Sequence, residues 1–231
     1  MKHRCSRRIY EFFLIMWISL FVGCEDGQSK GGTKMIKLPA PKLKGTMSVE
    51  EAIYKRRSRR SYAELPLSLE ELGQVLFAAY GITDTIRGLR ASPSAGATYP
   101  MEIYLVAGEV ENLEKGLYHY IPEKHSIELV KPGDIREPLR RASLGQSMIT
   151  EAPVSVIIAA ESKRTTSVYG ERGTRYIDME VGHIGQNIYL QCEALGLGTV
   201  AIGAFKDEQV KNVLGIKEMP LYIMPIGRQV K

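Results

Sequence analysis

The uninterrupted apolar run Val154–Ala160 is the feature that most constrains the fold of this chain. A strand with one face in water alternates apolar and polar residues, whereas a strand covered on both faces reads as a continuous apolar run. Other short β-prone segments stand on either side of it, so we expect a sheet with helices packed on it. These segments are Ile103–Ala107, Gly116–Ile121, Ile127–Val130, Thr199–Phe205 and Leu221–Ile226.

Two Ser-x-Glu-Glu sequences mark the starts of helices. In Ser48–Glu51 and in Ser68–Glu71 the serine stands at the N-cap position and a glutamate follows three residues later, which is the pattern of a capping box. The second helix is predicted to run to Tyr80 and to stop at Gly81. The apolar stripe of the first helix consists of Val49, Ala52 and Ile53. Further helices are expected over Asp134–Ser143, Arg175–Leu195 and Asp207–Leu214. Helices and strands interleave around a mixed sheet, so the predicted class is α+β, with one domain over residues 47–231.

Residues 55–62, Lys-Arg-Arg-Ser-Arg-Arg-Ser-Tyr, form a dense basic run at the end of the first predicted helix. Guanidinium groups and serine hydroxyls on an ordered element are good ligands for phosphate. The formal net charge is +5, of which about +3 belongs to residues 1–23 and about +2 to the remainder. Nucleic-acid binding draws on a broad basic face. We therefore expect no nucleic-acid partner and favour a site for a single anion, with a solvated helix end as the alternative.

The first 23 residues are interpreted as a signal peptide. Basic Lys2–Arg8 precedes the apolar run Phe12–Gly23, which is too short to span a bilayer comfortably as a helix but suits a signal sequence. Phe21–Cys24 resembles a bacterial lipobox, so Cys24 is the expected acylation site of a protein anchored by lipid in the extracytoplasmic cell envelope. An uncleaved signal anchor is one alternative. A mis-assigned start, which leaves the protein in the cytoplasm, is another. Residues 24–46 are predicted to be a flexible tether.

Cysteine and histidine usage argues against a metal enzyme. Cys5 lies in the leader and Cys24 is the proposed lipid site, so Cys192 is left without an internal disulfide partner and is expected to be a small buried residue. The histidines show neither i,i+4 pairing nor an HExxH context, so a zinc enzyme is not expected.

Three segments and the chain's ending together resemble a known family. The segments are Arg56–Tyr62, Ser92–Pro100 and Glu193–Phe205, and the ending is Pro225–Arg228. In their order and spacing they are similar to the signature blocks of nitroreductase-like FMN flavoproteins. Glu180–Asn187 and the ending resemble in particular the dehydrogenase branch that includes azoline-oxidising enzymes of peptide natural-product pathways. The resemblance implies a nitroreductase-like fold, a central mixed or antiparallel sheet flanked by helices, in a homodimer with FMN at the interface.

The resemblance also implies which residues hold the FMN. Arg56, Ser58 and Arg60 match the phosphate ligands of the family, and Arg228 resembles a further ligand from the end of the chain. Two segments of mainly small residues match those that lie against the flavin ring. They are Pro93, Ser94, Ala95 and Gly96, and Ala201, Ile202, Gly203 and Ala204. Small side chains let backbone amides approach a flat heterocycle closely. Ala97 stands where the family often has asparagine, which removes one side-chain hydrogen bond to the ring.

The function implied is that of an FMN-dependent oxidoreductase with ping-pong hydride transfer between small-molecule substrates. A GxGxxG dinucleotide fingerprint is absent from the sequence, so any NAD(P)H would visit the flavin transiently, and an exported protein would need another donor, such as a quinol or the substrate itself. The alternatives are an NAD(P)H-dependent nitro or quinone reductase, and a non-catalytic flavin-binding or basic-patch interaction protein. No catalytic acid or base is assigned. Polar groups on the long helix that are expected only to satisfy local hydrogen bonds are His183, Gln186 and Asn187.

Overall fold

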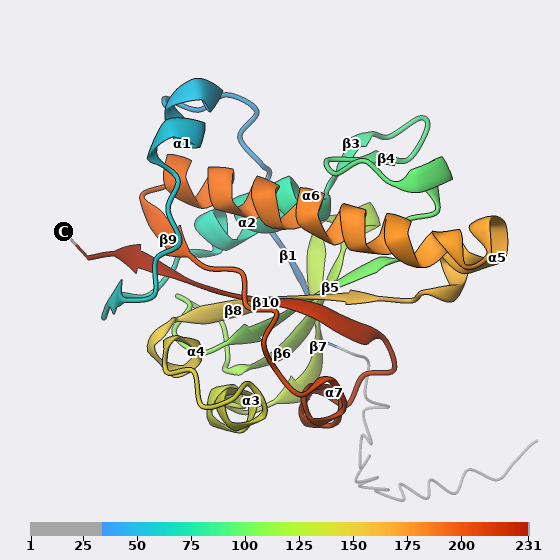
Figure 1. Cartoon of the computed structure of the whole chain (residues 1–231). Coiled ribbons are helices and arrows are strands. Elements are labelled where there is room, and N and C mark those ends of the chain that lie inside the picture. The colour runs from blue at the N-terminus through green and yellow to red at the C-terminus, as the bar shows by residue number, and fades with distance from the viewer. Residues whose placement is uncertain (1–33, 231) are drawn as a thin grey trace, which may run out of the picture. The chain divides into compact units, whose positions relative to one another are not determined.

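The computed structural model describes residues 34–230, in which a sheet of 8 strands carries helices on both faces (Figure 1). The strand order is β1-β7-β6-β5-β8-β10-β2, with β9 also paired to β10, and every one of these pairs is antiparallel. The expected α+β class is therefore confirmed. A separate two-stranded sheet pairs β3 with β4. The strands are β1 (Met35–Lys37), β2 (Tyr62–Ala63), β3 (Ile82–Asp84), β4 (Leu89–Arg90), β5 (Met101–Ala107), β6 (Gly116–Ile121), β7 (Ser126–Pro132), β8 (Val154–Ala160), β9 (Leu197–Thr199) and β10 (Met219–Gln229).

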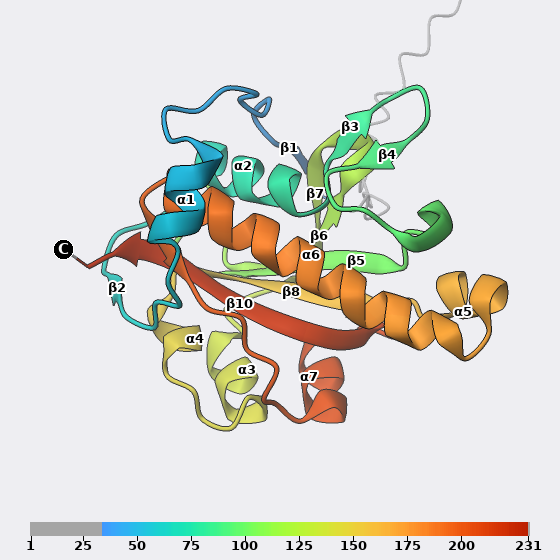
Figure 2. The ribbon, with the colours of Figure 1, turned by 45° about the horizontal axis from the view of Figure 1, so that its top comes forward.

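The helices form a layer on each side of the sheet. Figure 2 shows α1, α2 and α6 above the sheet and α3, α4 and α7 below it, with α5 at the N-terminal end of α6. The helices are α1 (Val49–Lys55), α2 (Leu69–Tyr80), α3 (Arg136–Ala142), α4 (Met148–Glu151), α5 (Lys163–Tyr169), α6 (Arg172–Ala194) and α7 (Asp207–Leu214), with 3-10 turns at Ala95–Ala97 and Pro122–Lys124.

The apolar run that predicted a doubly covered strand is β8. It lies between β5 and β10, and all 7 of its residues are buried. Because successive side chains of a strand point to opposite faces, Val156 and Ile158 pack into the core under α2 and α6, while Ile157 and Ala159 pack into the core over α3, α4 and α7. The sheet is thereby fixed between two apolar layers.

The predicted helix starts are found at both serines. Ser68 forms a complete capping box with Glu71, whereas at α1 the Ser48 Oγ accepts a hydrogen bond from the Glu51 amide and the Glu51 carboxylate instead pairs with a lysine. Helix α2 ends at Gly81 as predicted, but the glycine is extended rather than left-handed. A Cβ at Gly81 would lie 2.3 Å from the Phe77 ring, so close packing is what requires glycine there.

Part of the predicted tether is ordered, which corrects the expected boundary at residue 47. Residues 35–37 form β1 on the edge of the sheet, where Ile36 pairs with Ile127 of β7. Leu38 is buried in the main core, and the Lys42 amide bonds to Gln74. Burial of apolar side chains and strand pairing offset the chain entropy that composition alone suggested would dominate.

Two further expectations differ from the structure. The strand predicted over residues 199–205 ends at Thr199, and only Ile202 pairs again, in an isolated bridge with Ile223. The apolar stripe of α1 is not buried in the single chain: Val49 is 57% and Ile53 56% exposed, and only Ala52 is buried.

The proposed signal peptide and Cys24 lie outside the described residues. Among residues 34–230, none of the helices is both long and apolar enough to cross a membrane.

Candidate functional site

The basic run continues from α1 as an extended segment fixed against the sheet. Arg56 is the C-cap of α1, Ser58 bridges to Thr199, and the Arg59 amide donates to the Thr199 carbonyl over 2.9 Å. The Tyr62 hydroxyl donates to the Arg59 carbonyl over 3.0 Å. The segment is therefore held by its backbone, which leaves its side chains available for other contacts.

Tyr189 of α6 joins this segment to the second small-residue block. Its hydroxyl lies 2.9 Å from Ser58 Oγ and accepts a hydrogen bond of 2.8 Å from the Ala201 amide. The guanidinium of Arg56 lies 5.1 Å from the centre of the Tyr189 ring, within cation–π range. Residues from two predicted cofactor-binding blocks thus meet on Tyr189, a side chain that lies in none of the predicted blocks. The exposed Arg60 lies in the same extended segment.

Residues 201–204 form an irregular segment that approaches Tyr222 closely. Ile202 exchanges two backbone hydrogen bonds with Ile223, of 2.9 and 3.0 Å, while Gly203 and Ala204 are exposed. A Cβ at Gly203 would lie 3.6 Å from the Tyr222 ring, and one at Gly185 of α6 would lie 3.4 Å from the same ring. Both distances are ordinary van der Waals contacts, so the Tyr222 ring lies between α6 and this segment without crowding.

The first small-residue block, Pro93–Gly96, lies against the middle of the same helix. The Pro93 carbonyl is 3.3 Å from Nδ1 of His183, and the Ser94 Oγ accepts a hydrogen bond of 3.0 Å from the Tyr99 amide. The backbone is left-handed at Gly96, with φ of 57°. A Cβ there would lie 2.3 Å from the Tyr169 hydroxyl of α5. Glycine at this position is thus required by both the dihedral angle and the packing.

Asn187 holds the start of this loop. Its side-chain amide donates to the carbonyl of Ala78 over 3.1 Å and to Ser92 Oγ over 3.0 Å, and the Ser92 hydroxyl in turn donates to the Ala79 carbonyl. Both polar side chains are satisfied, but not locally as expected, because Pro93 lies 90 positions from His183 and Ala78 lies 109 positions from Asn187. The groups they satisfy belong to the loop expected to hold the flavin ring and to the residues leading into it.

A buried carboxyl group lies behind the loop. Glu180 of α6 is 2% exposed and accepts a hydrogen bond of 2.8 Å from the Tyr80 hydroxyl. Burial raises the pKa of Glu180 above its ordinary value, although hydrogen bonds from Ser94 and Tyr80 act in the opposite direction. In the sequence, Glu180 stands out only as the first residue of the segment Glu180–Asn187. Its burial depends on the tertiary packing of α2 against α6.

Arg228 has a different bonding partner from the other predicted phosphate ligands. It forms a bidentate ion pair with Glu71, at 2.8 and 3.0 Å, and Glu71 is also the capping-box residue of α2. These bonds occupy two of the five N–H donors of the guanidinium. Its role as a phosphate ligand stays a prediction.

The remaining cations of the basic run line a separate cavity of about 500 Å³. Arg57 donates to the carbonyls of Tyr54 and Arg56 at the C-terminus of α1. Lys55 pairs with Glu51, and Arg59 lies 3.3 Å from Glu193. Cations placed against helix C-termini are stabilising, and Lys55, Arg57 and Arg59 each have a partner within the protein.

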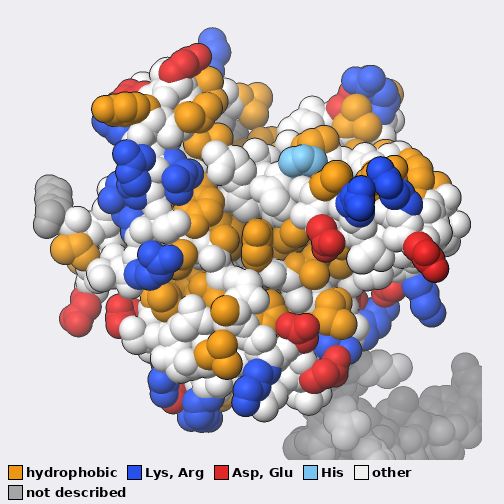
Figure 3. Space-filling model, in the orientation of Figure 1, with side chains coloured by type: hydrophobic (Ala, Val, Ile, Leu, Met, Phe, Trp, Pro, Cys, Tyr) orange, Lys and Arg blue, Asp and Glu red, His pale blue; other side chains and the backbone are white. Residues whose placement is uncertain are grey.

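The site as a whole extends along α6. Figure 3 shows Lys and Arg side chains gathered on one side of this face and hydrophobic side chains in the band beneath the long helix. Arg56, Ser58 and Arg60 supply guanidinium and hydroxyl donors, and two segments of mainly small residues lie along α6. These are the kinds of group that suit a flat cofactor carrying a phosphate. The donor set therefore suits FMN.

This fold and site are those of a nitroreductase-like protein. Residues 53–228 match the Nitroreductase family, and the chain belongs to that family, whose members are in general FMN-dependent oxidoreductases. A Methanocaldococcus jannaschii protein assigned to the nitroreductases is 49% identical over 87% of this chain and 100% of its own length.

Two further comparisons agree with this. The microcin B17-processing protein McbC of Escherichia coli is 27% identical over 70% of this chain and 62% of its own length. This similarity agrees with the predicted resemblance to the azoline-oxidising branch. The chain spans less than two thirds of the length of McbC. A nitroreductase-type structure from Ralstonia eutropha superposes with a TM-score of 0.75 at 27% identity, covering 85% of this chain and 90% of that one.

Proposed function

We propose that this protein is an FMN-dependent oxidoreductase that binds its flavin along α6. The observation that carries the proposal is the convergence of three sequence-distant blocks on this helix. Ser58 and Ala201 meet at Tyr189, and Pro93 meets His183. The helix and the three blocks are thus arranged to contact both ends of one elongated ligand.

The phosphate would be held by side chains at one end of the site. A helix C-terminus such as that of α1 repels anions, so Arg56, Ser58 and Arg60 have to supply the attraction. Arg228 retains N–H donors beyond those used by Glu71, and we assign it as a further ligand. Lys55, Arg57 and Arg59 are left out of the phosphate clamp.

The ring would lie against Pro93–Gly96 and Ala201–Ala204. When bound, FMN supplies the ability to accept a hydride from one substrate and deliver it to another. The chain's own contribution is to orient the ring with backbone groups and to leave one face open, so that donor and acceptor use the site in turn. The described residues give no basis for assigning a catalytic acid or base.

The working form would be a homodimer. The exposed stripe of α1 consists of Val49 and Ile53. Val49 lines an apolar groove of about 330 Å³ together with Ala78, Asn187 and Leu190. Helix α6 also exposes Met179 at 52%. An apolar helix face left uncovered in one chain is well suited to a subunit interface, and a second copy is the occupant that the family resemblance favours.

The place of action would be the cell envelope, with the protein anchored through lipid at Cys24. The basic and apolar pattern of residues 1–23 supports this proposal. Outside the cytoplasm NAD(P)H is absent, so the donor would be a quinol or the oxidised substrate itself. A start codon assigned too far upstream would instead leave the protein in the cytoplasm, where NAD(P)H is available.

A nitro or quinone reductase is the second candidate. The 49% identical relative assigned to the nitroreductases favours it, whereas McbC, named for processing a microcin, favours a dehydrogenase that acts on its substrate. A non-catalytic flavin-binding or basic-patch protein is the alternative of another class.

The test is anaerobic flavin reduction by a panel of donors. Purified protein is expected to show FMN absorbance that dithionite bleaches and an added acceptor restores. Reduction by NADH or NADPH with turnover of nitroaromatics would favour the reductase, and reduction by a quinol alone would favour the envelope enzyme. Colourless protein that FMN cannot reconstitute would contradict the proposal. Bound flavin that no donor reduces and no acceptor reoxidises would instead support the non-catalytic flavin-binding protein.

A further inference from the structure

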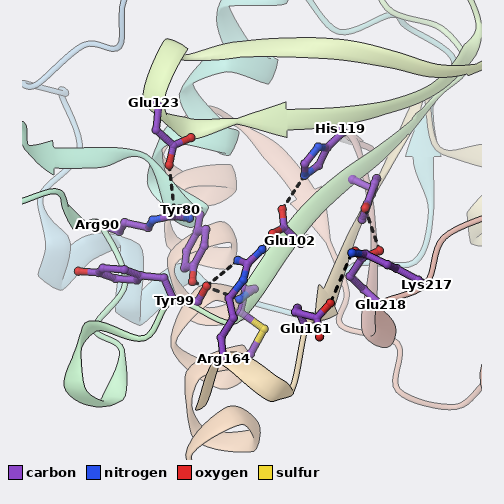
Figure 4. A network of polar contacts seen from close by, with 12 residues as sticks. Tyr80, Arg90, Tyr99, Glu102, His119, Glu123, Glu161, Arg164, Lys217 and Glu218 are labelled. Atoms are coloured by element: carbon purple, nitrogen blue, oxygen red, sulfur yellow. Dashed lines mark hydrogen bonds and ion pairs between the residues drawn. The ribbon is translucent and has the colours of Figure 1, made fainter. Parts of the chain in front are cut away.

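A second group of charged residues contacts the flavin loop from α5 and the neighbouring strand β5. Arg164 of α5 donates to the Tyr99 carbonyl over 2.9 Å and also bonds to Oε1 of Glu102 on β5. Figure 4 shows Glu102 between Arg164 and His119. None of these three residues belongs to the predicted cofactor site.

Glu102 holds two partners with its two oxygens. Oε2 of Glu102 lies 2.7 Å from Nε2 of His119 on β6, and the His119 ring stacks on Tyr104 at 4.7 Å. Burial raises the pKa of Glu102, but the hydrogen bonds and charges of His119 and Arg164 together lower it by more than burial raises it. The pKa of Glu102 therefore lies below its ordinary value. The carboxylate therefore stays ionised and bridges the β-sheet to α5.

Helix α5 in turn contacts the loop at further points. Thr165 Oγ1 lies 2.8 Å from Thr98 Oγ1, and the Tyr169 hydroxyl abuts Gly96. The loop has left-handed backbone at Ala97 and Tyr99, with φ of 51° and 44°. Such a conformation costs roughly 1–2 kcal/mol at each non-glycine residue and persists only where the surroundings impose it.

We propose that Glu102 and His119 are positioning residues for the flavin loop. By fixing the Arg164 guanidinium at the Tyr99 carbonyl, they hold residues 94–99 in the strained conformation that presents the backbone to the ring. The effect on flavin rests on the proposed function, whereas the effect on the loop does not. A surface ion pair without this role would contribute little to stability and nothing to the loop.

Hydrogen exchange of the protein as purified tests the proposal. Glu102→Gln keeps the shape of the side chain. Its NH₂ group, however, then faces either Arg164 or His119, and both of these donate to the wild-type carboxylate. We expect amides within residues 94–99 to exchange roughly tenfold faster, since a charge-assisted hydrogen bond is lost, with the global melting temperature nearly unchanged. His119→Phe keeps the stacking and should give a smaller increase, while Arg164→Lys should recover part of the effect of Arg164→Gln.

The matched control is Glu137→Gln, which removes ion pairs to Arg140 and Arg141 on α3. Loop exchange in this variant should match the wild type. FMN titration then provides the second measurement, with a several-fold weaker dissociation constant expected for Glu102→Gln. Unchanged loop exchange in both Glu102→Gln and Arg164→Gln overturns the positioning role. Failure of the wild type to bind FMN would contradict the proposed function alone, because loop exchange can be measured whether or not flavin is bound.

Discussion

The hydroxyl of Tyr189 lies 2.9 Å from Oγ of Ser58, although the two residues are 131 positions apart. The same oxygen accepts the Ala201 amide, so one phenol joins the arginine segment after α1 to the segment after β9. Both segments are largely irregular, and this contact ties each of them to α6 in addition to their backbone bonds.

Tyr189→Phe is expected to loosen both segments. The Ala201 amide loses its partner, which costs about 1–2 kcal/mol in the free energy of unfolding, and FMN retention should fall several-fold. Urea unfolding and FMN titration measure the two effects. Tyr54→Phe is the control because that side chain is 79% exposed. Equal behaviour of the two variants would remove Tyr189 from the site.

The double variant Arg56→Ala with Arg60→Ala is expected to lose flavin while remaining folded. Each charge-assisted contact to a phosphate is worth about 1.5–3 kcal/mol, so the dissociation constant should rise at least about a hundredfold. Arg140→Ala with Arg141→Ala changes the net charge equally on α3, away from the site. Flavin occupancy that stays at the wild-type level in the first variant would refute the phosphate assignment.

Gly96→Ala is expected to disrupt the ring-binding loop. The added Cβ would meet the Tyr169 hydroxyl at 2.3 Å, and the left-handed backbone adds a cost of roughly 1 kcal/mol. Thermal unfolding and the visible spectrum of bound flavin provide the readout. Adding Tyr169→Phe should restore part of the loss, since it removes the nearest atom. If the double variant is as stable as the wild type and binds flavin equally well, the left-handed dihedral angle carries no cost for alanine.

Glu180→Gln is expected to change how stability depends on pH. The pKa of Glu180 is raised in the folded state, so its stabilising contribution is fully present below its ordinary pKa and is lost as pH rises through the folded-state value. The variant should therefore gain stability relative to the wild type as pH rises above the ordinary pKa of 4.5, until the folded-state pKa of Glu180 is passed. Urea unfolding across this range measures the difference. Stability curves of Glu180→Gln and the wild type that run parallel across this pH range would disprove the pKa argument.

Local sequence signals predicted most of the secondary structure. The strand at 154–160 and the helix at 207–214 have the expected bounds, and Cys192 is buried in α6 as expected. Of the stripe that the helical period predicts for the long helix, Ile177, Val181, Ile184 and Ile188 are buried, whereas Leu195 is half-buried. These features depend on periodicity and capping, which act over a few residues. The prediction of a strand over residues 199–205 is wrong because the chain leaves the sheet after Thr199. The Ala201 amide there bonds to the Tyr189 hydroxyl, and only Ile202 pairs again with the sheet.

The sequence by itself determined the α+β class, the family blocks and the residue types able to hold a phosphate and a flat ring. Only the tertiary structure decided that β1 extends the domain, that Tyr189 and Glu180 support the site, and that Arg228 pairs with Glu71. The reason is physical. Capping and alternation are set by neighbours along the chain, whereas these contacts join residues far apart in sequence, and their geometry exists only once the sheet has fixed α2 and α6 on its face.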